Sequence, residues 1–124
     1  MANWARGAAT LRVDVDARSR PLAHEVLGSA ERSLRLYYFQ GPLLALVGDG
    51  TRDGARVTPI ARFGPDSDVG GFGTMPATIA IAAAEVGRGR AVVFSPHPEL
   101  SHEAPAGLLT AAASWAACVE RRPA

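Results

Sequence analysis

Lysine is absent from the sequence, and cysteine occurs only once. All 13 basic side chains are arginines, which excludes chemistry that needs a lysine amine, such as Schiff-base catalysis. Cys118 has no second cysteine to pair with, so an internal disulfide and a CxxC metal site are excluded as well. A chain without disulfides is typical of a reducing compartment, and we therefore expect a cytoplasmic protein.

The sequence also lacks an excess of charge of either sign and a long apolar run. The 12 acidic residues nearly balance the arginines and leave a net charge of +1, so nothing favours binding to nucleic acid or to an anionic membrane. No segment approaches the ~20 apolar residues that span a bilayer, and residues 1–7 lack the apolar core of a signal peptide. With 124 residues, 48% of them hydrophobic, the chain suits one soluble domain.

Short alternating or apolar runs predict a strand-rich fold. Residues 1–10 carry small side chains and are expected to form a loose tail, and residues 18–33 are mixed and turn-rich, with Pro21 and Gly28 as turn signals. The segment 77–86 is ambiguous, because its alanines favour a helix whereas its isoleucines and its short length favour a strand; we choose the strand. The strands that we expect are 11–15, 34–39 (stopped by Gln40-Gly41-Pro42), 56–63, 77–86 and 91–94.

The clearest helix signal lies near the C-terminus. Residues 105–122 carry apolar side chains at helical spacing, Pro105 suits a first turn, and Arg121 and Arg122 favour the last turn. Cys118 falls beside this apolar stripe, so we interpret it as a structural residue rather than a nucleophile. The predicted stripe comprises Leu108, Leu109, Ala112, Trp115, Ala116 and Val119.

The segment Ser95-Pro96-His97-Pro98-Glu99 directly follows the last predicted strand and carries the most chemical information. The prolines bias their preceding residues to extended backbone, so His97 and Glu99 lie about 6–7 Å apart along the chain. A carboxylate at that distance can hold the Nδ1 proton of the imidazole and leave Nε2 free to accept a proton from a nucleophile. The structural alternative is a rigid Pro-His-Pro turn in which Glu99 approaches the N-terminus of the final helix, and the sequence leaves both open.

Metal and cofactor sites have no support in the sequence. His24 and His102 each stand beside a glutamate, Glu25 and Glu103, but their spacing matches no ligand pattern that would join them to His97. We therefore expect neither a metal nor a cofactor.

Two segments together resemble a known family. Their combined pattern resembles the end of class I glutamine amidotransferase-like domains. The first segment is Tyr37-Tyr38-Phe39-Gln40-Gly41-Pro42, and the second is Gly87-Arg88-Gly89-Arg90-Ala91-Val92-Val93-Phe94 with Ser95-Pro96-His97-Pro98-Glu99 directly after it. Within that superfamily the pattern is similar to the biotin-protein ligase N-terminal-like branch. The resemblance implies an α/β fold with a flavodoxin-like sandwich, of which residues 11–122 would be the C-terminal portion.

In such families a cysteine on a strand-to-helix elbow attacks an amide, and a histidine and a glutamate near the C-terminus complete the triad. The resemblance implies that His97 is the base and Glu99 its orienter. The elbow cysteine and the oxyanion-hole loop have no counterpart here, so we expect at most an incomplete amide hydrolase or amidotransferase, inactive alone. An N-terminal half or a separate chain would have to supply the nucleophile.

Two other interpretations stay open at this point. The chain can be a non-catalytic interaction or binding module that associates with itself or with a partner, because missing elements would leave apolar surface exposed. It can also be an unrelated small α/β domain that contains a Pro-His-Pro turn.

Overall fold

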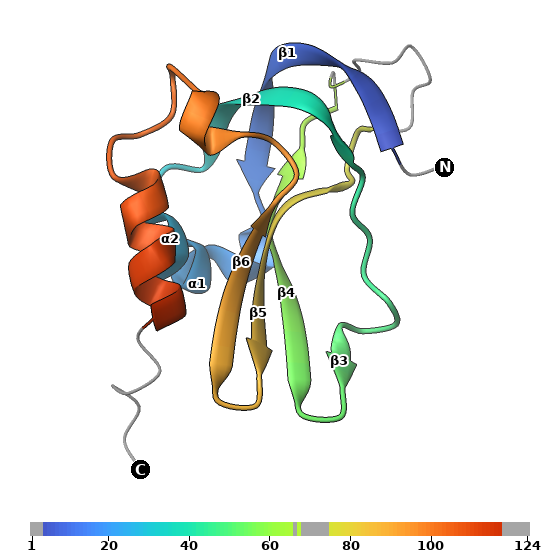
Figure 1. The fold of residues 1–124 in the computed structure, drawn as a ribbon, viewed down its shortest axis with the longest axis vertical. Coiled ribbons are helices and arrows are strands. Elements are labelled where there is room, and N and C mark those ends of the chain that lie inside the picture. Colours follow the sequence, from blue (N-terminus) through green and yellow to red (C-terminus); the bar gives the residue numbers. More distant parts are fainter. Residues whose placement is uncertain (1–3, 66, 68–74, 118–124) are drawn as a thin grey trace.

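The computed structural model describes residues 4–65, 67 and 75–117, which form a curled antiparallel sheet with two helices packed beside it (Figure 1). The predicted helix beyond residue 117, with Cys118 and Val119, lies outside the described residues. The elements are β1 (Trp4–Val15), a 3₁₀ turn (Ala17–Ser19), α1 (Arg20–Leu27), β2 (Ser33–Pro42), β3 (Thr51–Arg52), β4 (Ala55–Phe63), β5 (Ile79–Val86), β6 (Gly89–Phe94), a 3₁₀ turn (Pro98–Leu100) and α2 (Leu108–Ala117).

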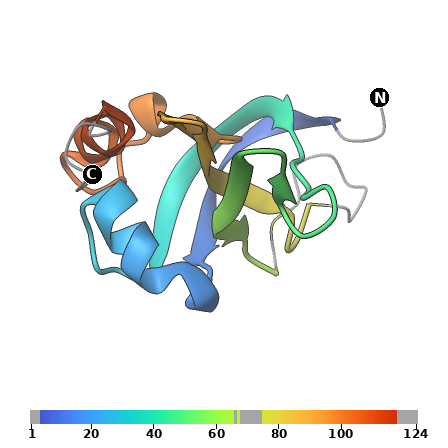
Figure 2. The same cartoon turned by 90° about the horizontal axis from the view of Figure 1, so that it is seen from below.

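The sheet has the strand order β2-β1-β4-β5-β6, with β3 paired to β4. All of the pairings between these described strands are antiparallel. Seen from below, the sheet curls, and α1 and α2 lie together on one side of it (Figure 2). The expected strand-rich α/β class with a C-terminal helix is confirmed. The flavodoxin-like arrangement is not confirmed, because sheets of that type are built from parallel strands.

Most of the strand predictions are confirmed, including the choice of a strand over a helix for the alanine-rich segment that forms β5. The segment 1–10 differs, since β1 already begins at Trp4 and pairs with the end of β2. β2 also continues through Gln40-Gly41-Pro42 instead of stopping there. A register shift opposite these residues, between Ala5 and Ala8, allows the ladder to pass the irregularity.

The prediction of turns for residues 18–33 is wrong, because α1 occupies the middle of this segment. Ser19 is the N-cap residue, and Pro21 stands at the start of the helix, where its missing N–H costs nothing. Gly28 ends the helix in the left-handed conformation (φ 66°), and its N–H donates to the carbonyl of His24 at 2.9 Å. Pro21 and Gly28 are therefore helix-boundary signals.

The C-terminal helix starts three residues later than predicted. Gly107 has φ 82° and stands just outside the helix, so α2 begins at Leu108 and Pro105 precedes it. The predicted stripe is confirmed at Leu108, Ala112 and Trp115, which are buried, whereas Leu109 is exposed. None of the helices among the described residues is long and apolar enough to cross a membrane.

The core lies between the inner face of the curled sheet and the two helices. Alternate residues of β2 (Leu34, Leu36 and Tyr38) are buried, as the period of two in a strand requires. The Tyr38 ring meets Phe63 edge-on, with centroids 5.7 Å apart. Across the interface, the core is completed mainly by Ala23, Val26 and Leu27 of α1 and by the buried residues of α2.

Arg90 joins α2 to the outermost strand, β6. Its guanidinium lies 4.5 Å from the centre of the Trp115 ring, and Nη1 donates to the Trp115 carbonyl at 3.0 Å. A cation near the last carbonyls of a helix complements the helix dipole, so this contact both holds and caps the end of α2.

Candidate functional site

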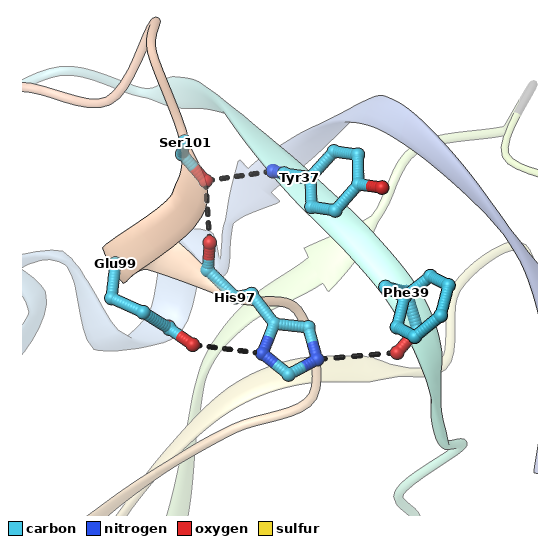
Figure 3. A network of polar contacts seen from close by, with 5 residues as sticks. All are labelled: Tyr37, Phe39, His97, Glu99 and Ser101. Carbon is cyan, nitrogen blue, oxygen red and sulfur yellow. Dashed lines mark hydrogen bonds and ion pairs between the residues drawn. The ribbon is translucent and has the colours of Figure 1, made fainter.

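The two segments on which the family resemblance rests meet in the structure. Residues 95–101 follow β6, at one edge of the sheet, and contact β2, at the opposite edge, where His97 and Ser101 bond to Tyr37 (Figure 3). Tyr37 and His97, which are 60 positions apart in the sequence, form an isolated antiparallel bridge. The aromatic segment 37–42 and the histidine segment 95–99 therefore form one local structure.

Backbone and side-chain hydrogen bonds fasten this loop to the edge of β2. The His97 N–H donates to the Tyr37 carbonyl at 2.6 Å. The Ser101 hydroxyl accepts from the Tyr37 N–H at 2.7 Å and donates to the His97 carbonyl at 2.7 Å. These bonds cover polar groups that an edge strand would otherwise expose. Ser101 was not predicted as part of the site. Its only signal in the sequence is its position four residues after His97, where a serine hydroxyl can donate to the carbonyl of the earlier residue.

A close approach at Gly41 completes the junction. An added Cβ at Gly41 would lie 2.7 Å from the Ser95 carbonyl oxygen, and the buried Ser95 hydroxyl donates to the Pro42 carbonyl at 2.6 Å. On the other side, the buried Tyr38 hydroxyl donates to the Gly41 carbonyl and accepts from the Gly41 N–H. Only a residue without a side chain fits between these neighbours.

His97 and Glu99 form the pair that the sequence predicts. Nδ1 of His97 lies 2.9 Å from Oε2 of Glu99, and the two side chains are 35% and 53% exposed. The hydrogen bond from His97 lowers the pKa of the Glu99 carboxyl, against a smaller opposing effect of burial. The carboxylate therefore holds the imidazole in one orientation, as an orienting residue would.

The second ring nitrogen is not free, contrary to the expectation for a base. Nε2 of His97 lies 3.1 Å from the Phe39 carbonyl oxygen. A carboxylate and a carbonyl only accept, so the ring donates to both at once only when each nitrogen carries a proton. Gln40, the residue after Phe39, has φ 43°, a strained conformation for a residue other than glycine. Proton abstraction by His97 requires this contact with Phe39 to open.

The described residues near His97 supply no nucleophile for the ring. Both ring nitrogens contact acceptors, and the hydroxyls of Ser95 and Ser101 donate to backbone carbonyls. Among residues 4–65, 67 and 75–117, no three His, Cys, Asp or Glu side chains gather as a metal site. His24 lies on α1 and His102 in the exposed loop after Ser101.

Comparisons of the chain with protein-family models, with curated proteins and with solved structures find no match.

Replacing Glu99 by glutamine should lower stability by about 0.5 kcal/mol at neutral pH, because the pair is exposed. A carboxyl whose folded-state pKa is lowered stabilises the fold above its unfolded pKa, and that contribution is lost as the pH falls through the folded-state pKa. Urea denaturation at pH 7 and pH 3 should show the two proteins converging in acid. Glu25→Gln, on exposed α1 surface, is the control. An equal deficit at both pH values would contradict the prediction.

Proposed function

We propose that this chain is the C-terminal part of a class I glutamine amidotransferase-like domain, similar to the biotin-protein ligase N-terminal-like branch, with His97 as base and Glu99 as orienter. The 2.9 Å contact between Nδ1 and Oε2 carries this proposal. The direct contact between the two motif segments supports it further, because it accounts for their joint presence in the sequence. The nucleophile and the oxyanion hole would come from another segment or chain.

In this proposal two polypeptides supply the catalytic groups: this chain supplies the base and its orienter, and a partner supplies the nucleophile. Glu99 holds the proton on Nδ1, and Nε2 takes the proton of a cysteine thiol that the partner supplies. The thiolate attacks the amide carbon, the tetrahedral intermediate expels the amine, and the imidazolium gives that amine its proton. Water then attacks the thioester with Nε2 again as base, the C–S bond breaks, and the imidazolium returns the proton to the departing thiolate as the carboxylic acid is released. In the resting state Nε2 contacts the Phe39 carbonyl oxygen at 3.1 Å and donates to it when it carries a proton. This contact must open, and Nε2 must give that proton to solvent, before Nε2 can accept the proton of the partner's thiol.

An ammonia-release assay with glutamine tests this proposal. The purified chain should be inactive alone and active when combined with a polypeptide, encoded upstream or in a neighbouring gene, that carries a cysteine elbow. His97→Gln should lower the reconstituted rate by about 100-fold or more, whereas His102→Gln, in an exposed loop, should leave it unchanged. Activity of the isolated chain that survives Cys118→Ala but is lost in His97→Ala would show that the nucleophile lies within this chain.

A non-catalytic interaction module is the second candidate, favoured by the engaged state of Nε2. With both nitrogens bonded, His97 serves as a clamp that holds residues 95–101 on β2. Exposed apolar side chains at Phe39 and Val47 offer contact surface. Under this proposal, sedimentation velocity over a concentration series should show self-association, and no partner should restore amide hydrolysis. A monomer at all concentrations would contradict self-association.

A further inference from the structure

Two arginines face each other directly across the outer side of the sheet. Arg12 of β1 is the cross-strand partner of Arg35 of β2, and both side chains are about half exposed, 51% and 52%. Like charges in directly opposed positions destabilise a sheet. Because natural proteins tolerate such unfavourable pairings mainly at functional sites, the opposition of Arg12 and Arg35 indicates a candidate site.

A small polar hollow of about 230 Å³ opens at this pair. It is smaller than the roughly 300–1,000 Å³ of pockets for drug-sized ligands, so it suits only a small group. Gly64 continues the same row, since its N–H donates to the Arg12 carbonyl at 3.0 Å, and it contributes no side chain. Ser67, which is buried, also lines the hollow. The lining residues are Thr10, Leu11, Arg12, Arg35, Gly64 and Ser67.

Each arginine of the pair has one exposed carboxylate partner. Asp14 contacts Nε of Arg12 at 3.1 Å and accepts from its Nη2 at 3.4 Å. Glu103 contacts Nε of Arg35 at 3.3 Å, and Nη2 of Arg35 donates to the Thr10 carbonyl at 3.5 Å. Exposed ion pairs of this kind contribute little to stability, so both can rearrange at low cost. Each guanidinium has five N–H groups, and these contacts use Nε and Nη2, so a ligand would bind through Nη1 and the second N–H of Nη2. Farther along the same face, Arg62 is paired with Asp16.

We propose that this hollow binds the phosphoryl group of inorganic phosphate or of a small phosphate ester. Two guanidiniums can each present a fork of N–H donors to the oxygens of one phosphoryl group, which suits arginine better than any other cation. The site uses neither His97 nor Glu99, so it stands apart from the proposed amide chemistry.

Amide NMR of the intact chain tests the proposal, with inorganic phosphate and glycerol 3-phosphate titrated separately against chloride at constant ionic strength. Saturable shifts should concentrate at the amides of Arg12, Arg35, Gly64 and Ser67. Tighter binding of glycerol 3-phosphate would identify an ester as the ligand, and equal binding would identify the phosphoryl group alone. Acetate should bind more weakly than either, because it carries one negative charge and only two oxygens.

Variants identify the groups responsible. Arg12→Gln and Arg35→Gln should each weaken phosphate binding about tenfold or more, since a charge-assisted fork is lost. Arg52→Gln, on the short exposed strand β3, should bind as the parent chain does. Shifts in the parent chain that do not saturate, that centre elsewhere, or that persist equally in all three variants would overturn the proposal. If a variant does not fold, the amide shifts of the parent chain test the proposal on their own, because they must saturate and concentrate at the hollow.

Discussion

Gly28→Ala is expected to lower the free energy of unfolding by about 3 kcal/mol. Gly28 ends α1 at φ 66°, where a residue with a Cβ loses about 1–2 kcal/mol. The added Cβ would also lie 2.7 Å from Cβ of Ala111 on α2, so the two helices would have to separate. Overpacking of this kind costs about 1–3 kcal/mol. Urea denaturation of the parent and variant chains measures the difference.

Gly87→Ala separates backbone strain from steric clash. Gly87 has φ 57°, close to that of Gly28, but an added Cβ would meet nothing within 4 Å. Gly87→Ala should therefore lower the free energy of unfolding through backbone strain alone, by about 1–2 kcal/mol. Ala111→Gly in the Gly28→Ala background should recover part of the packing loss, and a double-mutant cycle measures that coupling. Equal costs at positions 28 and 87, with no coupling to Ala111, would show that the helices do not meet closely at Gly28.

The strands could be predicted from the sequence because apolar and polar side chains alternate along them. Leu34, Leu36 and Tyr38 alternate with Arg35 and more exposed neighbours, and this period of two follows directly from one buried face. By contrast, α1 has only eight residues, too few for a helical period to stand out, and its Pro21 and Gly28 are equally common in turns. Capping signals at both ends of a short segment therefore indicate a helix better than periodicity does.

The candidate site could be predicted only as far as local geometry extends. His97 and Glu99 are two positions apart between prolines, and their contact follows from extended backbone. The contact of Nε2 with Phe39 joins residues 58 positions apart, and it depends on how the curled sheet brings the end of β6 back to β2. The opposition of Arg12 and Arg35 depends likewise on the register of β1 with β2, which the sequence does not specify.

Gly41→Ala is expected to destabilise the chain by about 2 kcal/mol and to loosen the histidine loop. The added Cβ would lie 2.7 Å from the Ser95 carbonyl oxygen and 3.3 Å from the Tyr38 ring. Tyr38 is fully buried and cannot retreat, so Ser95 must move and shift His97 with it. Overpacking against backbone atoms gives the estimate of about 2 kcal/mol.

Hydrogen exchange reports where the loosening occurs. The His97 amide, which donates to the Tyr37 carbonyl at 2.6 Å, should exchange faster in Gly41→Ala by more than the global loss of stability requires, whereas amides in the centre of β5 should follow that global loss. Gly89→Ala is the matched control, because the nearest atom to its added Cβ is the Val86 carbonyl oxygen at an ordinary 3.4 Å. That variant should stay within about 0.5 kcal/mol of the parent chain. Uniform acceleration across the sheet in Gly41→Ala would mean that Gly41 supports the whole fold and not the junction between β2 and the histidine loop.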